Sequence, residues 1–406
     1  MNFKKILLTL VFVLSLFSVS AYAQTMQFTM GDYDAKVDNG AIEVRTMEVA
    51  PYTVEGRTMV PVRIIGETFG ADVQYIHEET KVIITLGDKK ISMIIGEAVA
   101  DVNGETVALD VPSVETNGRT LVPLRFVSET LGFDVKYVAV TEQILITNDV
   151  AAVEINGSKL YPADYAAVYG MYFAEYGETN SEEEIFAVTK VMLADYAIYE
   201  AESNKWDIPY PYDMKEDIVA NVAELDALYP GNLDAVWANL LEIECRASDL
   251  NDFLYQVYLP DAEAAENYKN TELKDYMAAK HILVSDEALA KQILTELKSG
   301  ADFDALMMEY TEDPGIQTNP EGYVFGEGEM VEEFETAVKA LKVDKVSGLV
   351  KTSYGYHIIK RIDIPQAFVV DSYANDYIAK HFTDVIEKGN VKIDAYTDAQ
   401  LLEMCK

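Results

Sequence analysis

The spacing of hydrophobic and polar positions changes twice along the chain. Up to about residue 148, apolar residues alternate with polar ones in short runs such as DVQYI at 72–76 and DVKYV at 134–138, which is typical of half-buried strands. From about 162 to 270 they recur at helical spacing, and beyond 275 short strand-like and helix-like runs follow one another. The pattern predicts a multidomain fold in which an α+β domain, an all-α domain and a second α+β domain succeed one another.

The first region contains an internal repeat. The run GRTMVPVRIIGETFGADVQYIHEETKVIIT at 56–85 aligns without gaps to GRTLVPLRFVSETLGFDVKYVAVTEQILIT at 118–147. Each copy predicts an extended segment, a brief helix, a glycine turn and two strands. The repeat resembles the copper-amine-oxidase N-terminal-like stalk domain of secreted and surface proteins, over about 27–148. That resemblance implies a spacer or an adhesive module, and it suggests the cell wall as a partner of the stalk domain.

Copper chemistry is not expected in this stalk domain, because its only histidine is His77. Arg63 and Arg125 stand at matching positions of the two copies. We expect them to form structural ion pairs, and ligand contacts are the alternative.

The second region, 151–274, is predicted to be helical and rich in aromatic residues. Its run DYAAVYGMYFAEY at 164–176 places aromatic side chains around much of a helix. Core packing is one reading of this run, and an apolar surface for unfolded proteins is the other. Helices are expected at 162–176, 182–204, 212–228, 233–258 and 262–270, and again in the C-terminal segment 365–406.

The first 23 residues have the layout of a secretory signal peptide. Lys4 and Lys5 precede an apolar run, and small residues lead to an expected cleavage site near Ala23. This predicts a secreted or cell-surface protein, without a lipid anchor because no cysteine lies near that site, and without a membrane span. In such a compartment a disulfide between Cys245 and Cys405 could persist, and pairing and non-pairing both stay open.

The balance of charges excludes one class of partner. The formal net charge is −37, with 69 acidic residues against 32 Lys and Arg. Such a polyanion repels phosphate backbones, so nucleic-acid binding is not expected. No metal-binding or dithiol motif occurs in the sequence, so we expect neither a metal nor another cofactor.

The third region, 275–364, reads as strand, two helices, strand, helix and strand, an order written β-α-α-β-α-β. The runs KHILV, DFDALMMEYTEDPG, GEMVEEFETAV and VSGLVKTSYGYHIIK occur in it in that sequence. In their order and spacing they resemble the parvulin, or PpiC-type, peptidyl-prolyl isomerase family. The resemblance implies catalysis of cis/trans isomerisation at X-Pro bonds, with no cofactor.

The same resemblance implies roles for individual residues. Polar groups expected to form the catalytic network are His281, Asp313, His357 and Thr352. Apolar groups expected to receive the proline ring are Met330, Phe334, Val324 and Phe325. Each has a structural alternative: a stabilising core histidine pair for His281 and His357, a turn before Pro314 for Asp313, and core packing for the apolar residues.

Two local features qualify the resemblance. Parvulins often carry a Gly-Gly-Asp/Glu-Leu-Gly run before the second strand, whereas this chain has NPEGYVFG at 319–326. The loop after the first strand, VSDEALAK at 284–291, is acidic, so selectivity for phosphorylated Ser/Thr-Pro bonds is not expected.

Helices on both sides of a parvulin domain resemble the architecture of PrsA-like and SurA-like extracytoplasmic foldases. That resemblance implies that 365–406 packs on the helical chaperone domain and that unfolded exported proteins and proline-containing peptides are the partners. Three hypotheses follow: a secreted isomerase with chaperone-type client binding, a weak or inactive parvulin acting as a holdase chaperone, and a surface adhesion or scaffold protein.

Overall fold

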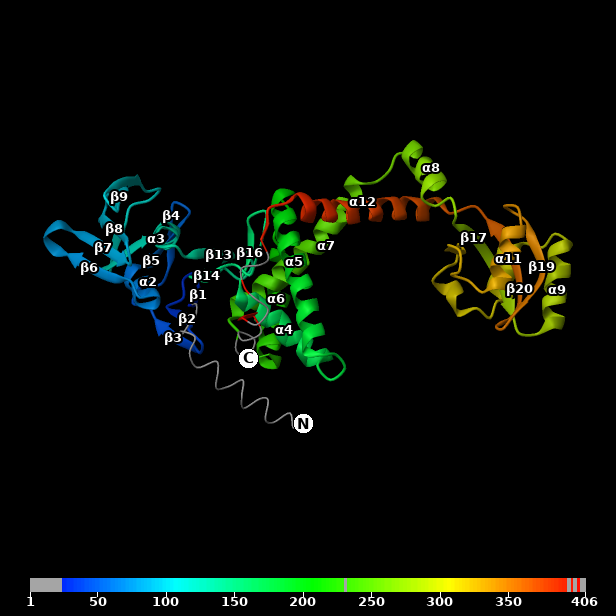
Figure 1. Ribbon diagram of the computed structural model, residues 1–406, viewed down its shortest axis with the longest axis horizontal. Coiled ribbons are helices and arrows are strands. Elements are labelled where there is room, and N and C mark those ends of the chain that lie inside the picture. The colour runs from blue at the N-terminus through cyan, green and yellow to red at the C-terminus, as the bar shows by residue number, and fades with distance from the viewer. Residues whose placement is uncertain (1–23, 230–231, 393–395, 397–399, 402–406) are drawn as a thin grey trace, which may run out of the picture. The chain divides into compact units, whose positions relative to one another are not determined.

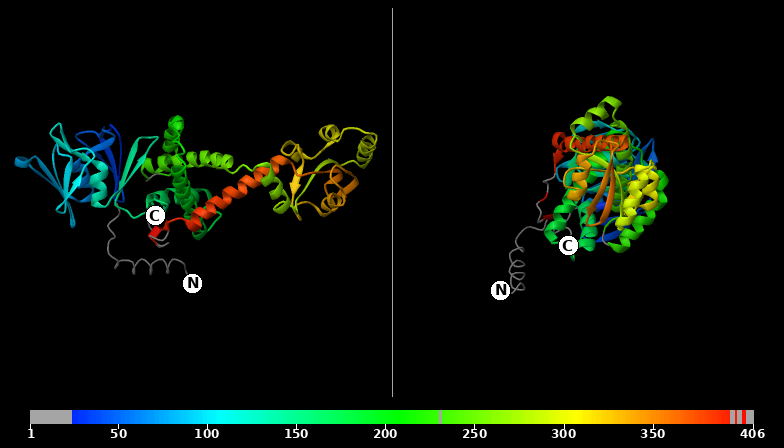
Figure 2. Two further views of the ribbon diagram at one scale, coloured as in Figure 1. Left: turned by 90° about the horizontal axis from the view of Figure 1, so that it is seen from above. Right: turned by 90° about the vertical axis from the view of Figure 1, so that its right-hand side faces the viewer.

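The computed structural model describes residues 24–229, 232–392, 396 and 400–401. The chain forms two units: unit 1 reaches up to Leu250 and takes in the residues from Val385, and unit 2 holds Asn251–Asp384 (Figures 1 and 2). The predicted signal peptide and Cys405 lie outside the described residues, so the cleavage stays a prediction and the pairing of Cys245 with Cys405 stays open. Among the described residues, no helix combines the length and the apolar character needed to cross a membrane.

The N-terminal part of unit 1 is β-rich, and short helices lie between its strands (Figure 1). The strand orders are β13-β14-β1-β2-β3, β10-β9-β8-β7-β6 and β11-β12-β5-β4. The strands are β1 (Thr25–Thr29), β2 (Asp34–Asp38), β3 (Ile42–Thr46), β4 (Tyr52–Val54), β5 (Arg57–Pro61), β6 (Asp72–Ile76), β7 (Lys81–Leu86), β8 (Lys89–Ile94), β9 (Val99–Val102), β10 (Glu105–Ala108), β11 (Val114–Thr116), β12 (Arg119–Pro123), β13 (Asp134–Val138) and β14 (Gln143–Thr147). The helices are α2 (Val62–Phe69) and α3 (Leu124–Leu131).

The two repeat copies are intertwined. Strands β13 and β14 of the second copy join β1–β3, whereas β6 and β7 of the first copy join β8–β10. Two ion pairs show the same exchange. Arg57 of the first copy bonds Asp110, which precedes the second copy, at 2.6 Å, and Arg119 of the second copy bonds Glu48, which precedes the first. One hydrophobic core contains residues of both copies. The strands of each copy therefore form sheets with strands from the part of the chain next to the other copy.

Arg63 and Arg125 form the ion pairs that the sequence predicts. Their partners are Glu67 at 3.9 Å and Glu129 at 3.4 Å, each one helical turn further along. All four side chains are exposed, so these pairs contribute little stability.

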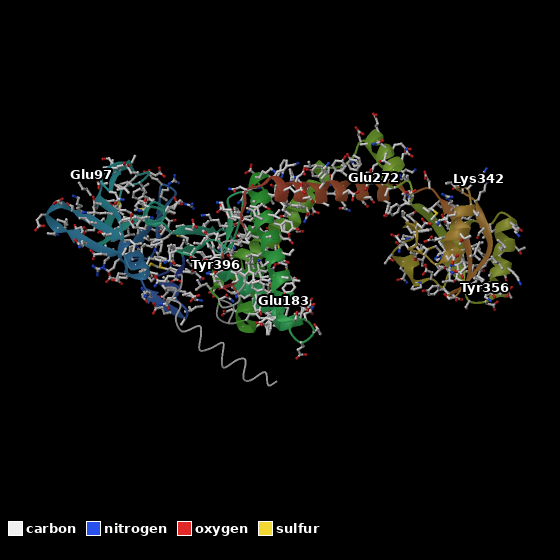
Figure 3. The ribbon with its side chains drawn as sticks, in the orientation of Figure 1. Glu97, Glu183, Glu272, Lys342, Tyr356 and Tyr396 are labelled. Carbon is white, nitrogen blue, oxygen red and sulfur yellow. The ribbon has the colours of Figure 1, made fainter. Side chains whose placement is uncertain are left out.

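The rest of unit 1 is mainly helical, and its helices lie where the periodicity predicts them. They are α4 (Pro162–Tyr176), α5 (Glu182–Lys205), α6 (Lys215–Leu228) and α7 (Asp234–Val257), of which α7 continues into unit 2. Ser181 begins α5 with a capping box formed with Glu184, beside the acidic first turn where Figure 3 labels Glu183. Helix α7 shares a core with the N-terminal sheets, because Trp237 packs in one cluster with Val138 and Leu145.

The prediction of an all-α domain is wrong in one respect. Strands β15 (Val153–Ile155), β16 (Ser158–Leu160) and β21 (Val391–Lys392) form a small sheet. The first two are joined by Asn156 and Gly157, both with positive φ, which is the two-residue turn typical of hairpins. An Asn-Gly pair between alternating apolar residues was the sequence signal for this hairpin.

Unit 2 contains a four-stranded antiparallel sheet with helices on both faces (Figure 1). Its order is β18-β17-β20-β19. Helices α9 and α10 pack on one face and α11 packs on the other. The elements are β17 (Met277–Val284), α9 (Glu287–Lys298), α10 (Phe303–Tyr310), β18 (Tyr323–Phe325), α11 (Glu332–Ala340), β19 (Val346–Thr352) and β20 (Gly355–Ile362).

The predicted β-α-α-β-α-β order lacks one strand. The segment read as a bend and a final strand is a hairpin of β19 and β20, in which Thr352 pairs with Gly355. Gly355 has φ of 144°, and a Cβ there would come within 2.7 Å of the Val284 carbonyl oxygen. Gly355 directly follows the two turn residues, 353 and 354, and a residue with a side chain there would clash with β17.

Two further helices of unit 2 flank this α+β part of the chain. Helix α8 (Ala262–Thr271) precedes it, and α12 (Gln366–Lys388) follows it and continues into unit 1. Within unit 2, α12 contacts the end of α7 through the 2.9 Å bond between Tyr258 Oη and His381 Nδ1, and contacts α8 through Tyr268 and Asp376.

Candidate active site

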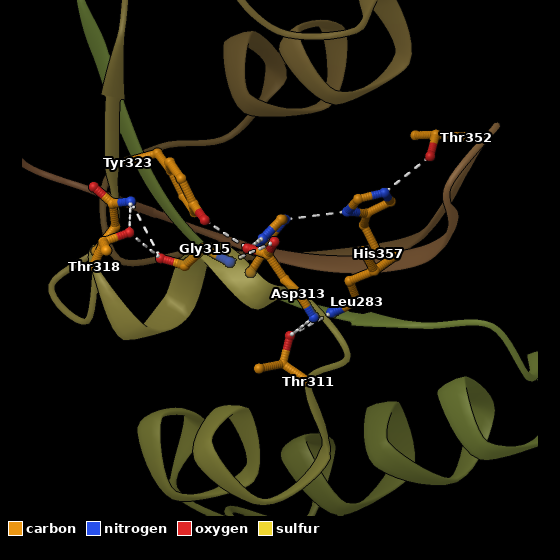
Figure 4. Close-up of polar contacts among 10 residues, drawn as sticks. Leu283, Thr311, Asp313, Gly315, Thr318, Tyr323, Thr352 and His357 are labelled. Carbon is orange, nitrogen blue, oxygen red and sulfur yellow. Dashed lines mark hydrogen bonds and ion pairs between the residues drawn. The ribbon is translucent and has the colours of Figure 1, made fainter.

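Two histidines meet on the face of the sheet that α11 covers. His281 lies in β17 opposite Ile359, and His357 lies in β20 opposite Leu283, so the two side chains are diagonal neighbours on one face. The Nδ1 atoms of the two rings are 3.1 Å apart (Figure 4). Both residues are buried, with His281 9% and His357 4% exposed.

The histidines belong to a longer chain of hydrogen bonds. His281 Nε2 lies 2.8 Å from Asp313 Oδ2, and Thr352 Oγ1 lies 2.9 Å from His357 Nε2. The Tyr354 backbone N–H donates to Thr352 Oγ1. The structure thus brings together all four polar residues that the family resemblance implies.

The direction of these bonds follows from the carboxylate at one end. An ionised Asp313 only accepts, so His281 Nε2 carries a proton and, in a neutral ring, its Nδ1 accepts. His357 must then donate from Nδ1 and accept at Nε2 from the Thr352 hydroxyl. Every ring nitrogen has a partner when both histidines are neutral.

Asp313 combines the two roles that the sequence left as alternatives. Its Oδ1 accepts from the Gly315 backbone N–H at 3.1 Å, which caps the turn Pro314–Gln317. Its Oδ2 accepts from His281 and, at 2.6 Å, from the Tyr323 hydroxyl. The turn fixes the carboxylate, and the second oxygen is directed to the histidines.

The surroundings shift two ionisation equilibria. Burial, followed by the effect of neighbouring His281, lowers the pKa of His357 to about 4, which keeps this ring neutral at pH 7. Burial alone would raise the pKa of Asp313, but hydrogen bonds from Tyr323, His281 and Gly315 outweigh it, and the pKa is lowered. The network therefore holds one fixed negative charge, on Asp313, and the neutral imidazole of His357.

Tyr323 is a site residue that the sequence reasoning missed. Its ring lies edge-on to His281 with centroids 5.4 Å apart, and its hydroxyl bonds Asp313. Burial and the bond to Asp313 raise the pKa of Tyr323 to about 12, so it remains a donor. The signal was its position two residues before Phe325, on the same face of a strand.

The apolar residues differ in exposure. Phe334 is 3% exposed, and its ring lies edge-on to both His281 and His357, with centroids at 5.3 and 5.6 Å. Met330 is half-buried and packs against the same cluster. Phe325 is 1% exposed, and its ring lies edge-on to the ring of Phe334, which it supports from within the core.

Val324 does not lie with the other candidate residues. Strand β18 pairs Tyr323 with Ala279 and Phe325 with Met277, which places these side chains on the histidine face. Because side chains alternate along a strand, Val324 points to the opposite face. The expectation that it lines the proline-binding surface is corrected accordingly.

Glu335 orders the loop that carries Met330. Its Oε1 accepts from the Gly328 N–H at 2.7 Å and from the Met330 N–H at 3.0 Å. These backbone bonds, that of Met330 foremost, lower the pKa of Glu335. Sequence reasoning did not single out this residue, although it lies in the first turn of α11 next to Phe334.

The site offers hydrogen bonds, a fixed charge and an apolar surface. Within the described ranges, no group of three or more His, Cys, Asp or Glu side chains could hold a metal ion. Cys245 in α7 is half-buried and lies in unit 1, outside this network.

Two protein families match the chain. The PPIC-type PPIASE domain covers residues 274–363, and the copper amine oxidase N-terminal domain matches over 19–75 and 36–146. Both resemblances stated from the sequence are confirmed. The matched PPIC-type domain makes the chain a peptidyl-prolyl cis/trans isomerase of the parvulin type.

Individual relatives indicate a more specific family within the parvulin-type isomerases. "Foldase protein PrsA" of Geobacillus sp. (strain WCH70) is 34% identical over 224 residues, which are 50% of this chain and 78% of that protein. The chain belongs to the PrsA foldase family. "Foldase protein PrsA" of Geobacillus kaustophilus is 47% identical over 109 residues, 26% of this chain and 38% of the relative. Among solved structures, NmPin, the parvulin of Nitrosopumilus maritimus, is 39% identical with a TM-score of 0.21, covering 22% of this chain and 97% of its own.

Proposed function

We propose that the chain catalyses cis/trans isomerisation of X-Pro bonds in unfolded exported proteins, through the hydrogen-bonded network around His281 and His357. One observation carries this proposal: the ring of Phe334 lies against both histidines of the network, and the half-buried Met330 packs against the apolar cluster that contains Phe334. A proline ring held against Met330 would lie on the same face of the sheet as the network.

The reaction needs no covalent chemistry. Conjugation of the amide imposes a rotation barrier of about 18–20 kcal/mol, and conjugation is lost in the twisted amide. Binding the proline ring while the preceding carbonyl turns favours the twisted form, which is complementarity to the transition state.

Asp313 contributes through its charge. The planar amide carries more negative charge on its carbonyl oxygen than the twisted amide does. A carboxylate near that oxygen therefore disfavours the planar form and lowers the barrier. His281, His357, Thr352 and Tyr323 act by holding this carboxylate in place and ionised.

One observation favours the alternative of a parvulin with weak turnover. Gly322 has φ of 103°, and a Cβ there would lie 2.9 Å from the Ala279 carbonyl oxygen. Gly322 or Val324 stands where parvulins often carry a leucine, and a leucine at position 322 would require a shift of the backbone. Without that leucine side chain, the apolar surface that receives proline is smaller, which would weaken turnover. A holdase chaperone is therefore the second candidate function.

The helical part of unit 1 supplies a candidate surface for clients. Large apolar side chains on α4 and α5 are exposed, namely Phe173 at 48%, Tyr176 at 41%, Val188 at 44% and Val191 at 61%. Apolar surface of this kind commonly marks interaction sites. We propose that it holds unfolded segments outside the cytoplasm, where the predicted signal peptide would direct the chain.

Prolyl-limited refolding of a client tests the proposal. We expect catalytic amounts of the whole chain to accelerate it, and Met330→Ala to reduce the acceleration about tenfold by removing apolar contact with the proline. Met308→Ala is the matched control, because Met308 is 68% exposed on α10. Suppressed aggregation without acceleration would favour the holdase, and neither effect would favour the adhesion or scaffold protein.

A further inference from the structure

Strand β3 ends one of the N-terminal sheets, and no strand among the described residues pairs with its outer edge. It is the last strand in the order β13-β14-β1-β2-β3, and within the described residues it pairs with β2 only. Its side chains are mostly exposed, with Val44 at 62% and Ile42 at 39%. An edge of this kind presents unpaired backbone groups to any second strand.

Two other edge strands differ from β3 in length or regularity. Strand β19 carries an irregularity between Val346 and Leu349 that interrupts its register. Strand β10, which takes the corresponding place in the second five-stranded sheet, has four residues and reads ETVA, without a cation. Strand β3 reads IEVRT and has five residues in continuous register with β2.

The sequence of β3 is complementary to itself when reversed. In an antiparallel pair centred on Val44, Val44 lies opposite Val44 of the second copy and Ile42 lies opposite Thr46. Glu43 then lies opposite Arg45 in both directions. We propose that two copies of the chain associate through β3 in this register, with a two-fold axis at Val44.

The positions of the charges make this pairing selective. Glu43 and Arg45 pair in register with Val37 and Ala35 of β2, which are fully buried, so they point to the core side of the sheet. Within one chain Arg45 Nε bonds Glu43 Oε1 at 2.8 Å. Charges on this side discourage pairing with an arbitrary strand, whereas a second β3 offers each of them its opposite.

Neighbouring registers are less favourable. Centring the pair on Glu43 or on Arg45 would place like charges directly opposite each other, which is destabilising. A shift by one residue would set Arg45 opposite Val44. The interface is one strand pair, so we expect a weak, reversible dimer.

Charge reversal tests the register on the full chain. Sedimentation equilibrium should show monomer and dimer at about 100 µM, a concentration suited to weak association. Glu43→Arg and Arg45→Glu should each weaken self-association about tenfold, since each sets like charges opposite. An equimolar mixture of the two variants should associate again, because one contributes two cations and the other two anions.

A cross-link gives a second readout. Val44→Cys should form an intermolecular disulfide under mild oxidation, since Cα atoms directly opposite lie about 4.5–5.5 Å apart in antiparallel pairs. Val107→Cys on β10 is the matched control and should not cross-link beyond wild type. A wild type that stays monomeric at about 1 mM, unaltered association of both charge variants, or equal cross-linking at 44 and 107 would each overturn the proposal.

Discussion

At the scale of single residues, the site depends on which atoms carry protons. The carboxylate of Asp313 orients His281, His281 orients His357, and His357 orients the Thr352 hydroxyl. The sequence could place these four residues through resemblance to a family, but it could not show the order of donors and acceptors. That order depends on the register of β17 and β20, which brings residues 76 positions apart into contact.

Because of His357, the free energy of unfolding should decrease as the pH is lowered. Its pKa is about 4 in the folded chain against 6.5 ordinarily, so between these values the unfolded chain binds a proton that the folded chain does not. The stabilisation is present above pH 6.5 and is lost as the pH falls. We expect a loss of about 2 kcal/mol in the free energy of unfolding between pH 7 and pH 5.

The measurement for His357 is denaturant unfolding at both pH values, followed through NMR signals of Ile358 and Ile359 in the same strand. His357→Gln should remove this part of the pH dependence, which separates it from other groups. A His357 imidazole that titrates near pH 6.5 in the folded protein would disprove this assignment.

Tyr323→Phe should alter Asp313 without unfolding the domain. Loss of the hydroxyl removes one hydrogen bond to the carboxylate, so the pKa of Asp313 should rise and stability should drop by about 1–2 kcal/mol. An NMR titration of the Asp313 carboxyl carbon reads the pKa directly. Tyr354→Phe is the control, because Tyr354 is 71% exposed, and equal titration curves in wild type and Tyr323→Phe would refute the role of Tyr323.

At the scale of elements, the helices and most of the third region were predictable. The hairpin of β19 and β20 and the exchange of strands between the two repeat copies were not. Helical periodicity located α4 to α8, because each buries one stripe of side chains. The repeat at 56–85 and 118–147 was visible in the sequence, yet alignment cannot show that β7 pairs with β8 and β14 with β1. Val324 was misplaced because the family resemblance assigned it to the proline-binding surface, whereas alternation along β18 puts it on the face opposite to Tyr323 and Phe325.

The loop before α11 should depend on Glu335. Glu335→Ala removes the acceptor for Gly328 and Met330, so amide hydrogen exchange at these two positions should rise about tenfold. Isomerase activity should decrease as Met330 loses its fixed position, whereas Glu335→Gln keeps an acceptor oxygen and should retain most of both properties. Unchanged exchange in Glu335→Ala would contradict this account of the loop.

At the scale of the whole molecule, the chain joins an isomerase domain to parts for which we propose other tasks. The residues of the candidate active site lie in unit 2, whereas the exposed apolar residues of α4 and α5 and the edge strand β3 lie in unit 1. Changes of period in the sequence indicated separate regions with boundaries near residues 150 and 275, whereas the two units divide within α7 and α12. Sequence patterns could not reveal contacts within unit 1, such as the bond from the Val140 N–H to Glu242, because these depend on the tertiary fold.

We infer that the network around His281 and His357 belongs to a working isomerase. NMR exchange spectroscopy on X-Pro peptides, with catalytic amounts of the whole chain, tests it most directly. We predict faster cis/trans exchange with wild type and with Met308→Ala, and slower exchange with folded His357→Ala and Met330→Ala. No acceleration by folded wild type across a panel of residues preceding proline would contradict the claim and leave a proline-binding chaperone as the better account.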